Sequence, residues 1–259
     1  MNIVFIGAHP DDCETKCGGT AALLANAGHQ VHFVSVTDGS AGHHLTHGRI
    51  VAARRVSECE ESARHLGLAA YHILPNCDGH LLPTLEARAG IIRLIRQTQA
   101  DIVITHRPND YHPDHRYTSQ LVQDSAYLVM VPGVCCEVPP LRANPIYLYM
   151  SDHFRRPCAF VADLTVDITA FWDKKVASLA AHVSQYYEWL PWISGKDFLG
   201  APEDVPQDPA GRRNWLDQRF RTLLGEDYGQ ESYEICEYGR RISGDDLRRL
   251  LALPAADKQ

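Results

Sequence analysis

The sequence predicts an α/β fold of the Rossmann-like type, in which a mostly parallel sheet carries helices on both faces. Two observations predict it: short apolar runs typical of buried strands alternate with helical runs, and histidine-rich segments follow the first and the fourth apolar run. Strands that alternate with helices form a parallel sheet, and ligands collect beyond the carboxyl ends of its strands. A chain of 259 residues that is 45% hydrophobic can form one sizeable core.

The predicted elements alternate regularly through the first hundred residues. The expected strands are residues 2–6, 31–36, 71–74 and 101–105, and the expected helices are 20–27, 54–66 and 85–97. Beyond Tyr147 the pattern weakens to a strand-like run at 160–166, a helical run at 171–187 and a long surface loop at 189–207. We expect one domain over 1–259, with 189–259 as a C-terminal extension that forms a loop and the rim of the site.

The composition disfavours two classes of partner. A formal net charge of -7 argues against nucleic acid, because phosphate contacts need clustered lysine and arginine. No apolar stretch approaches the roughly 20 residues that span a bilayer, and Met1 leads directly into a strand without a basic leader. The eight cysteines form no paired C-x-x-C sets, which favours reduced thiols. We therefore expect a cytoplasmic protein whose partner is a small molecule.

The first chemistry-bearing motif follows the first predicted strand. It places the imidazole of His9 beside the adjacent carboxylates of Asp11 and Asp12. Zinc prefers imidazole nitrogen and carboxylate oxygen, and a catalytic site keeps one position for water. One aspartate can then bind the metal while its neighbour faces the water as a base. The alternative is a polar turn in which an aspartate caps the following helix.

The second motif follows the fourth predicted strand and spans residues 106–115. His115 could complete a site of two imidazoles and one carboxylate, the pattern of metal-activated hydrolases. Asp110 or Asp114 could fix a ring tautomer from outside the ligand set. His112 could donate a proton to the leaving amine or stabilise an oxyanion.

Together these motifs resemble the LmbE-like, or PIG-L, family of zinc-dependent N-deacetylases. The resemblance covers most of the chain through about Gln185. The matching segments are His9-Pro10-Asp11-Asp12, Gly18-Gly19-Thr20, Thr37-Asp38-Gly39, Arg55 with Glu58, Leu66-Gly67, Asp78-Gly79, His112-Pro113-Asp114-His115 and Lys175 through His182-Val183-Ser184-Gln185. The chain departs from many members at Cys13, which separates the aspartate pair from Glu14 and puts a role for Glu14 in doubt.

The resemblance implies a ligand set and a base. His9, Asp12 and His115 would bind Zn²⁺, and Asp11 would be the general base that takes a proton from the attacking water. A site of two histidines and one carboxylate also suits Fe²⁺. A homo-oligomer, either a trimer or a hexamer, is implied as well.

The resemblance also implies roles around the substrate. His112 would act as the acid or stabilise the oxyanion, helped by Asp114. Arg55 and Asp78 occupy positions similar to sugar-contacting residues, although Arg54 competes with Arg55 for that role. The alternative for Arg55 is a surface salt bridge.

The expected function is removal of an N-acetyl group from an N-acetylglucosamine-type amino sugar or glycoconjugate. One alternative is an amidase that cleaves a larger acyl group from an amino-sugar conjugate. Another is a non-catalytic sugar-binding or nucleotide-binding protein. The nucleotide alternative is weak because the first strand is followed by Gly7-Ala8-His9-Pro10 instead of a Gly-x-Gly-x-x-Gly fingerprint.

Several further histidines and aromatic residues have open roles. They are His43, His44 and His47 in the loop after the second strand, His182 in a predicted helix, and Trp189, Trp192 and Phe198 in the following loop. The loop histidines are expected to be solvated, with a substrate contact as the alternative. His182 is either a hydrogen-bonded core residue or a residue that reaches a site in its own or a neighbouring subunit. The aromatic residues form either a wall for a sugar ring or a hydrophobic plug under the loop.

Overall fold

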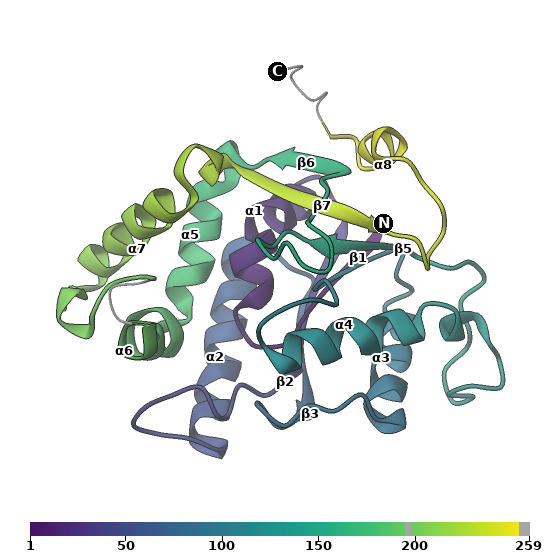
Figure 1. Cartoon of the computed structure of the whole chain (residues 1–259), viewed down its shortest axis with the longest axis horizontal. Coiled ribbons are helices and arrows are strands. Elements are labelled where there is room, and N and C mark those ends of the chain that lie inside the picture. The colour runs from purple at the N-terminus through teal and green to yellow at the C-terminus, as the bar shows by residue number, and fades with distance from the viewer. Residues whose placement is uncertain (195–197, 254–259) are drawn as a thin grey trace.

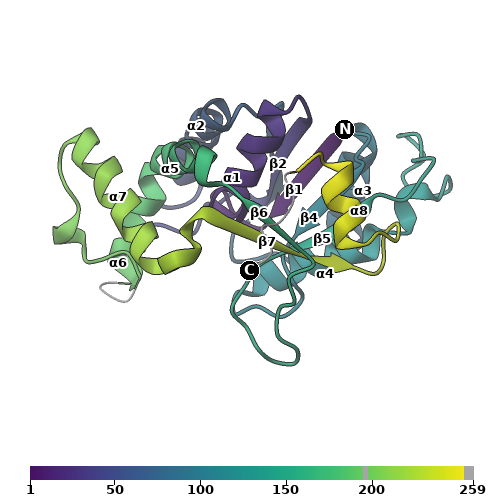
Figure 2. The same cartoon turned by 90° about the horizontal axis from the view of Figure 1, so that it is seen from above.

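The computed structural model describes residues 1–194 and 198–253, and it contains a seven-stranded sheet with helices packed on both faces (Figure 1, Figure 2). The strand order is β3-β2-β1-β4-β5-β7-β6. The first five strands in that order are parallel, whereas β7 runs antiparallel to both β5 and β6. The predicted mostly parallel α/β sheet is therefore confirmed.

The strands and helices have the following bounds. The strands are β1 (Asn2–Gly7), β2 (Gln30–Thr37), β3 (Ala70–Asn76), β4 (Ile102–Thr105), β5 (Ile146–Met150), β6 (Leu164–Asp167) and β7 (Gln230–Cys236). The helices are α1 (Asp12–Asn26), α2 (Arg49–Leu66), α3 (Leu85–Gln97), α4 (Pro113–Ser125), α5 (Trp172–Ala181), α6 (Leu190–Ser194), α7 (Pro209–Leu224) and α8 (Gly244–Leu250). A π-helical segment spans Ser184–Trp189, and short 3₁₀ turns span Leu128–Met130, Thr169–Phe171, Pro202–Asp204 and Gly225–Gly229.

Two apolar cores form because successive side chains of a strand point to opposite faces of the sheet. Along β1, Ile3 and Phe5 enter one core with residues of α1 and α5, while Val4 and Ile6 enter the other with residues of α3 and α4. All four side chains are fully buried. Since β1 has neighbours on both sides, the segment that follows it is held at the centre of one sheet edge.

Helix α1 begins at Asp12, well before the predicted start at residue 20. The prediction treated Gly18 and Gly19 as part of a loop, but both lie inside the helix. A Cβ on Gly19 would lie 2.5 Å from the Cδ1 atom of Ile168, so the glycine allows the helix to pack closely there. Tertiary packing thus overrides the low helix propensity of glycine.

The C-terminal part differs more from the expectation. The predicted helix 171–187 divides at His182 into α5 and the π-helical segment, and the predicted loop 189–207 contains α6. The predicted extension 189–259 is more than a rim, because β7 lies between β5 and β6 in the sheet. Residues 195–197 of the predicted loop and 254–259 of the extension lie outside the described residues. Every helix in the described ranges is too short or too polar to cross a bilayer.

Candidate metal centre

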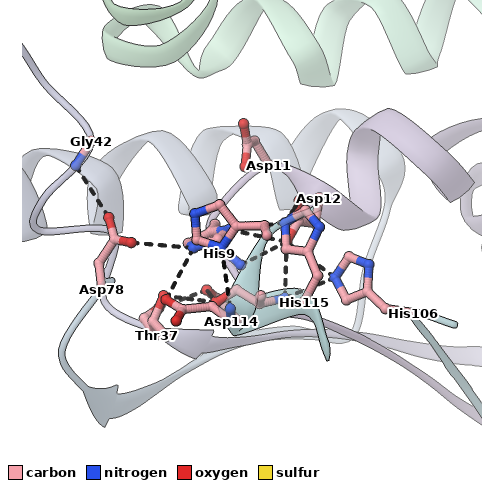
Figure 3. Close-up of polar contacts among 12 residues, drawn as sticks. His9, Asp11, Asp12, Thr37, Gly42, Asp78, His106, Asp114 and His115 are labelled. Carbon is pink, nitrogen blue, oxygen red and sulfur yellow. Dashed lines mark hydrogen bonds and ion pairs between the residues drawn. The ribbon is translucent and has the colours of Figure 1, made fainter. Parts of the chain in front are cut away.

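The three predicted metal ligands converge beyond the carboxyl ends of β1 and β4 (Figure 3). The Nδ1 atom of His9 lies 3.2 Å from the Nε2 atom of His115. The carboxylate of Asp12 lies 3.3 Å from His115 Nε2 through Oδ1 and 3.5 Å from His9 Nδ1 through Oδ2. A tetrahedral Zn²⁺ with bonds of about 2.0–2.1 Å holds its ligand atoms about 3.3 Å apart. The Nδ1 atom of His9 and the Oδ1 atom of Asp12 each lie at about this spacing from His115 Nε2, and two imidazoles with a carboxylate are a donor set that fits a zinc-like cation.

The far nitrogen of each of the two histidines faces a carboxylate. His9 Nε2 lies 3.2 Å from Asp78 Oδ1 and 3.4 Å from Asp114 Oδ2, and His115 Nδ1 lies 3.1 Å from Asp110 Oδ1. A carboxylate there favours the tautomer that carries its proton on the far nitrogen, which leaves the near nitrogen free to bind a cation. The ring orientations thus agree with a metal site.

Asp12 is held in place by its own loop. Its Oδ2 atom accepts hydrogen bonds from the backbone N–H groups of Ala8 (2.9 Å) and His9 (2.8 Å). A Cβ on Gly7 would lie 2.7 Å from the Cβ of Asp12, so glycine at the end of β1 leaves room for this arrangement. Burial raises the pKa of Asp12, but the charge of His115 and the hydrogen bonds from His106 and His115 outweigh it and hold this pKa well below its ordinary value. Asp12 is therefore a fixed carboxylate.

Asp11 points away from its neighbour (Figure 3). Its backbone has a φ of 141°, which is strained for a residue with a side chain. Its side chain is buried and makes no capping hydrogen bond to α1, so the capping alternative does not describe it. Burial and the charge of Asp12 raise the pKa of Asp11 to about 7, with Arg55 opposing part of the rise. A carboxylate with this pKa is suited to accept a proton near neutral pH.

His112 is oriented by the start of α4. It is the N-cap residue, and its Nδ1 atom accepts a hydrogen bond from the backbone N–H of Asp114 at 3.2 Å, while Pro113 occupies the first helical position. Burial and the neighbouring His9 and His115 lower the pKa of His112. A neutral ring whose Nδ1 atom accepts a hydrogen bond carries its proton on Nε2. His112 is therefore a neutral hydrogen-bond donor.

The carboxylate of Asp114 faces His9 and not His112. Its Oδ2 atom accepts a hydrogen bond from the backbone N–H of Gly79 at 2.7 Å and lies near His9, whereas its link to His112 runs through its own backbone N–H. Asp114 thus orients His9 and, through its backbone, His112.

Arg55 and Asp78 lie together at one side of the metal centre. Asp78 Oδ2 accepts hydrogen bonds from the backbone N–H groups of Ala41 and Gly42, both at 3.1 Å. Arg55 is 1% exposed, donates to the carbonyl of Gly42 at 2.8 Å and bonds the side chain of Gln185. The surface salt-bridge alternative for Arg55 is therefore wrong.

Arg54 is the residue that forms the surface salt bridge. It is exposed and makes two bonds of 2.6 Å to Glu188. Its guanidinium group is therefore paired at the surface, and Arg55 is the arginine next to the metal centre. Glu188 also lies 2.8 Å from the Nε2 atom of the buried His43, so the expectation of a solvated loop histidine is wrong for His43.

Sequence reasoning missed His106. Its Nε2 atom lies 3.2 Å from Asp12 Oδ2, and its ring stacks on that of His115 with centroids 4.2 Å apart. Burial and the charge of His115 lower its pKa to about 4, so the ring is neutral. The available signal was its position directly after Thr105, the last residue of β4.

Glu14 and His182 are buried and bonded to each other behind the metal ligands. His182 is 0% exposed, and its Nε2 atom lies 2.7 Å from Glu14 Oε1, which also accepts a hydrogen bond from Ser62 at 2.6 Å. The core alternative for His182 is therefore the observed one. Burial lowers the pKa of His182, but Glu14 outweighs it and raises this pKa. A positive charge on His182 lowers the pKa of the nearby Asp11, against burial and the charge of Asp12, which raise it.

The metal-free site should bind a divalent cation more tightly as the pH rises. Burial lowers the pKa of His115, but Asp12 and Asp110 outweigh it and raise that pKa to about 9. Below about pH 9 a cation must therefore displace a proton, so the apparent affinity should fall at least about tenfold from pH 8 to pH 7. Competition against a chromophoric chelator, corrected for its own protonation, measures this slope. An affinity that does not change between these pH values would contradict the ligand role of His115.

Comparisons with known proteins agree with this geometry. Residues 4–126 match the family model described as PIG-L, GlcNAc-PI de-N-acetylase. Diacetylchitobiose deacetylase of Thermococcus kodakarensis is 30% identical over 208 residues, which cover 74% of each chain. 4-Oxalmesaconate hydratase of Pseudomonas putida is 26% identical over 195 residues, 72% of this chain and 74% of the relative. The solved structure of N,N'-diacetylchitobiose deacetylase from Pyrococcus horikoshii, with its inhibitor MPG, superposes with a TM-score of 0.68 at 26% identity, covering 91% of this chain and 84% of the other. The chain belongs to the PIG-L, or LmbE-like, family.

Proposed function

We propose that this protein is a zinc-dependent hydrolase that removes the acetyl group from the nitrogen of an N-acetylglucosamine-type amino sugar. The observation that carries the proposal is the convergence of His9, Asp12 and His115, with the ring of His112 4.6 Å from that of His9 and the buried Asp11 adjacent to Asp12. The relatives named as deacetylases support the same reaction. Fe²⁺ is the alternative cation for this ligand set.

The residues divide the hydrolysis between them. When bound, the cation supplies Lewis-acid chemistry, which acidifies a water molecule and polarises the amide carbonyl. Asp11 accepts one proton of the attacking water, whose oxygen bonds to the carbonyl carbon. His112 donates a hydrogen bond from Nε2 to the oxyanion that develops. As the C–N bond breaks, Asp11 returns the proton to the nitrogen, and the products are an amine and acetate.

The charge around the centre favours a neutral sugar over a polycarboxylate. Four carboxylates lie around the proposed ligands, those of Asp11, Asp78, Asp110 and Asp114. Among the residues that the structure describes, the positive side chain buried beside Asp11 and Asp78 is that of Arg55. The relative named 4-oxalmesaconate hydratase is named for a carboxylic-acid substrate. The carboxylates of this site would repel such a negatively charged substrate. We propose that Arg55 and Asp78 instead hold hydroxyl groups of the sugar.

The test is an acetate-release assay with zinc-loaded protein. The panel contains N-acetylglucosamine, its oligomers, and conjugates in which it is joined to inositol, malate or a lipid. It also contains analogues with longer N-acyl groups, and an unsaturated oxo-acid that tests for hydratase activity. We expect acetate and free amine from at least one amino-sugar compound, and none from the His112→Asn variant, which keeps a side chain able to cap α4. Water addition to the oxo-acid without acetate release would contradict the proposal.

We also propose that the protein forms a homo-oligomer in the cytoplasm. An apolar, cysteine-containing run extends from Tyr127 to Cys136, and both end residues are exposed, Tyr127 by 69%, which supports a contact surface there. All eight cysteines are free thiols, which supports a reducing compartment. Light scattering at micromolar concentration measures the assembly, and a monomer would contradict it.

A further inference from the structure

Two adjacent thiols line a cavity beside α3. Cys135 and Cys136 lie in the loop between the 3₁₀ turn Leu128–Met130 and β5, and both line a cavity of about 470 Å³ together with residues of α3. Both are free thiols; Cys136 is exposed and Cys135 is half-buried. We call this space the thiol cavity. None of the residues that line it belongs to the metal centre, so it is a separate feature of the molecule.

The guanidinium group of Arg96 fixes the loop that carries both thiols. Arg96 lies on α3, is fully buried, and donates hydrogen bonds to six backbone carbonyls of residues 128–138, including that of Cys135 at 3.0 Å. The backbone of Cys135 has a φ of 47°, in the left-handed region that residues with a side chain seldom adopt. Consecutive side chains of an extended segment point to opposite sides, whereas this turn brings both cysteines to one cavity. Strain of this kind is common at functional sites.

The thiol cavity carries an excess of positive charge. Arg88 and Arg93 line it from α3, and Glu137 is the acidic residue that lines it. Arg93 is paired with Glu137. In the ranges that the structure describes, the guanidinium group of Arg88 has no hydrogen-bond or ion-pair partner. Because a guanidinium group binds carboxylates well, the cavity favours a negatively charged ligand beside the two thiols.

A thiol in such a place can exchange with a disulfide. The Cys136 thiolate attacks one sulfur of a disulfide R–S–S–R, the S–S bond of the reagent breaks, and the products are Cys136–S–S–R and R–S⁻. The sulfur of Cys136 is oxidised, the sulfur that leaves takes the electron pair and is reduced, and an excess of R–SH reverses the step.

The neighbouring Cys135 is poorly placed to expel the attached group. It is joined to Cys136 by a trans peptide bond, which sets the two Cα atoms about 3.8 Å apart. Ordinary disulfides join Cα atoms that are about 4.4–6.8 Å apart, so a bond between the two cysteines would be strained. The mixed disulfide on Cys136 is therefore expected to persist until a free thiol removes it.

We infer that the thiol cavity is a site of reversible S-thiolation, at which an anionic low-molecular-weight disulfide of the glutathione type transfers one of its halves to Cys136. The inference goes beyond the proposed deacetylation and does not depend on it. A cavity of about 470 Å³ lies within the size range of ligand pockets, so it can hold a small peptide thiol. Cys136 also ends the run that we propose as a contact surface. The attached group would lie in that contact, so S-thiolation and assembly through this surface would exclude one another.

The test compares three disulfides of different charge on the zinc-loaded protein. They are glutathione disulfide, which has more carboxylates than ammonium groups, the neutral 2-hydroxyethyl disulfide, and cystamine, which has only ammonium groups. Peptide mass spectrometry measures the rate at each cysteine, and Cys77, which is exposed and outside the cavity, is the internal reference. We expect glutathione disulfide to modify Cys136 before Cys77. Relative to the same ratio at Cys77, Cys136 should prefer glutathione disulfide over cystamine about three- to tenfold, the worth of one or two exposed ion pairs.

Variants of the cavity decide whether its charge and its two thiols have these roles. Arg88→Gln should remove the preference and leave the rate with the neutral disulfide unchanged, whereas Arg142→Gln, an exposed arginine outside the cavity, should keep the preference. Cys136→Ser should lose the modification, and Cys135→Ser should retain it. The inference would be overturned by a Cys136 that reacts no faster than Cys77, by a preference that survives Arg88→Gln, or by a disulfide between Cys135 and Cys136 in place of the mixed one.

Discussion

Asp11→Asn should leave zinc content and folding intact while lowering kcat by about 10²- to 10⁴-fold, the usual worth of a general base. The amide is nearly isosteric with the carboxylate, and the side chain of Asp11 makes no capping bond to α1 that the change would remove. Its carboxylate points away from that of Asp12, so the change leaves the proposed ligand in place (Figure 3). The loss should therefore be confined to proton transfer. Elemental analysis and steady-state kinetics on the same preparation measure both quantities.

Asp12→Asn is the matched variant, and it should lose the cation itself. The Oδ2 atom of Asp12 accepts two backbone N–H groups, from Ala8 and His9. An asparagine must keep its oxygen there to accept them, so its NH₂ group turns toward the cation. Affinity should fall by more than the 10- to 100-fold typical of losing an outer-shell partner. If Asp11→Asn lost zinc while Asp12→Asn kept it and was only slow, Asp11 would be the metal ligand and Asp12 the base. If both variants stayed fully active, the proposed metal-hydrolase mechanism would be wrong.

The first half of the fold was predictable because each strand is an apolar run of its own. The prediction failed where long-range partners decide the structure. Strand β7 pairs with β5 and β6, which are distant in sequence, and no local pattern reveals that insertion. Helix α4 is absent from the predicted elements because its N-cap is a histidine, which is not a usual capping residue. Its first turn also contains His115, so the sequence there is interpreted as a metal-binding motif and not as the start of a helix.

The candidate site was predictable to the extent that its residues follow strand ends. The proposed ligands His9 and His115 come after β1 and β4, whose carboxyl ends meet at one sheet edge. The arrangement around Arg55 was not predictable, because its partner Gln185 is 130 positions away and lies on a π-helical segment. The same holds for His43, whose partner Glu188 belongs to that segment.

A buried ion pair joins two elements of the C-terminal half, α5 and β7, to α1. Lys175 on α5 bonds Glu231 on β7 at 2.6 Å, and their side chains are 3% and 2% exposed. Glu231 also accepts the backbone N–H groups of Gly19 (3.0 Å) and Thr20 (2.7 Å) within α1. One carboxylate thus satisfies a lysine and two backbone groups, which gives a structural reason for the lysine in this segment.

Lys175→Met should therefore lower the free energy of unfolding by roughly 3–5 kcal/mol, because it leaves the carboxylate of Glu231 buried without its counter-charge. Urea unfolding followed by circular dichroism measures the loss. The double variant Lys175→Met with Glu231→Gln should be more stable than Lys175→Met alone, since the neutral amide oxygen still accepts a backbone N–H and no charge stays buried. Arg249→Met, which breaks the exposed pair with Asp246, is the control and should change the unfolding free energy little. A loss for Lys175→Met as small as that of the control, or a double variant less stable than the single one, would contradict the description of Glu231 as a buried carboxylate that depends on the charge of Lys175.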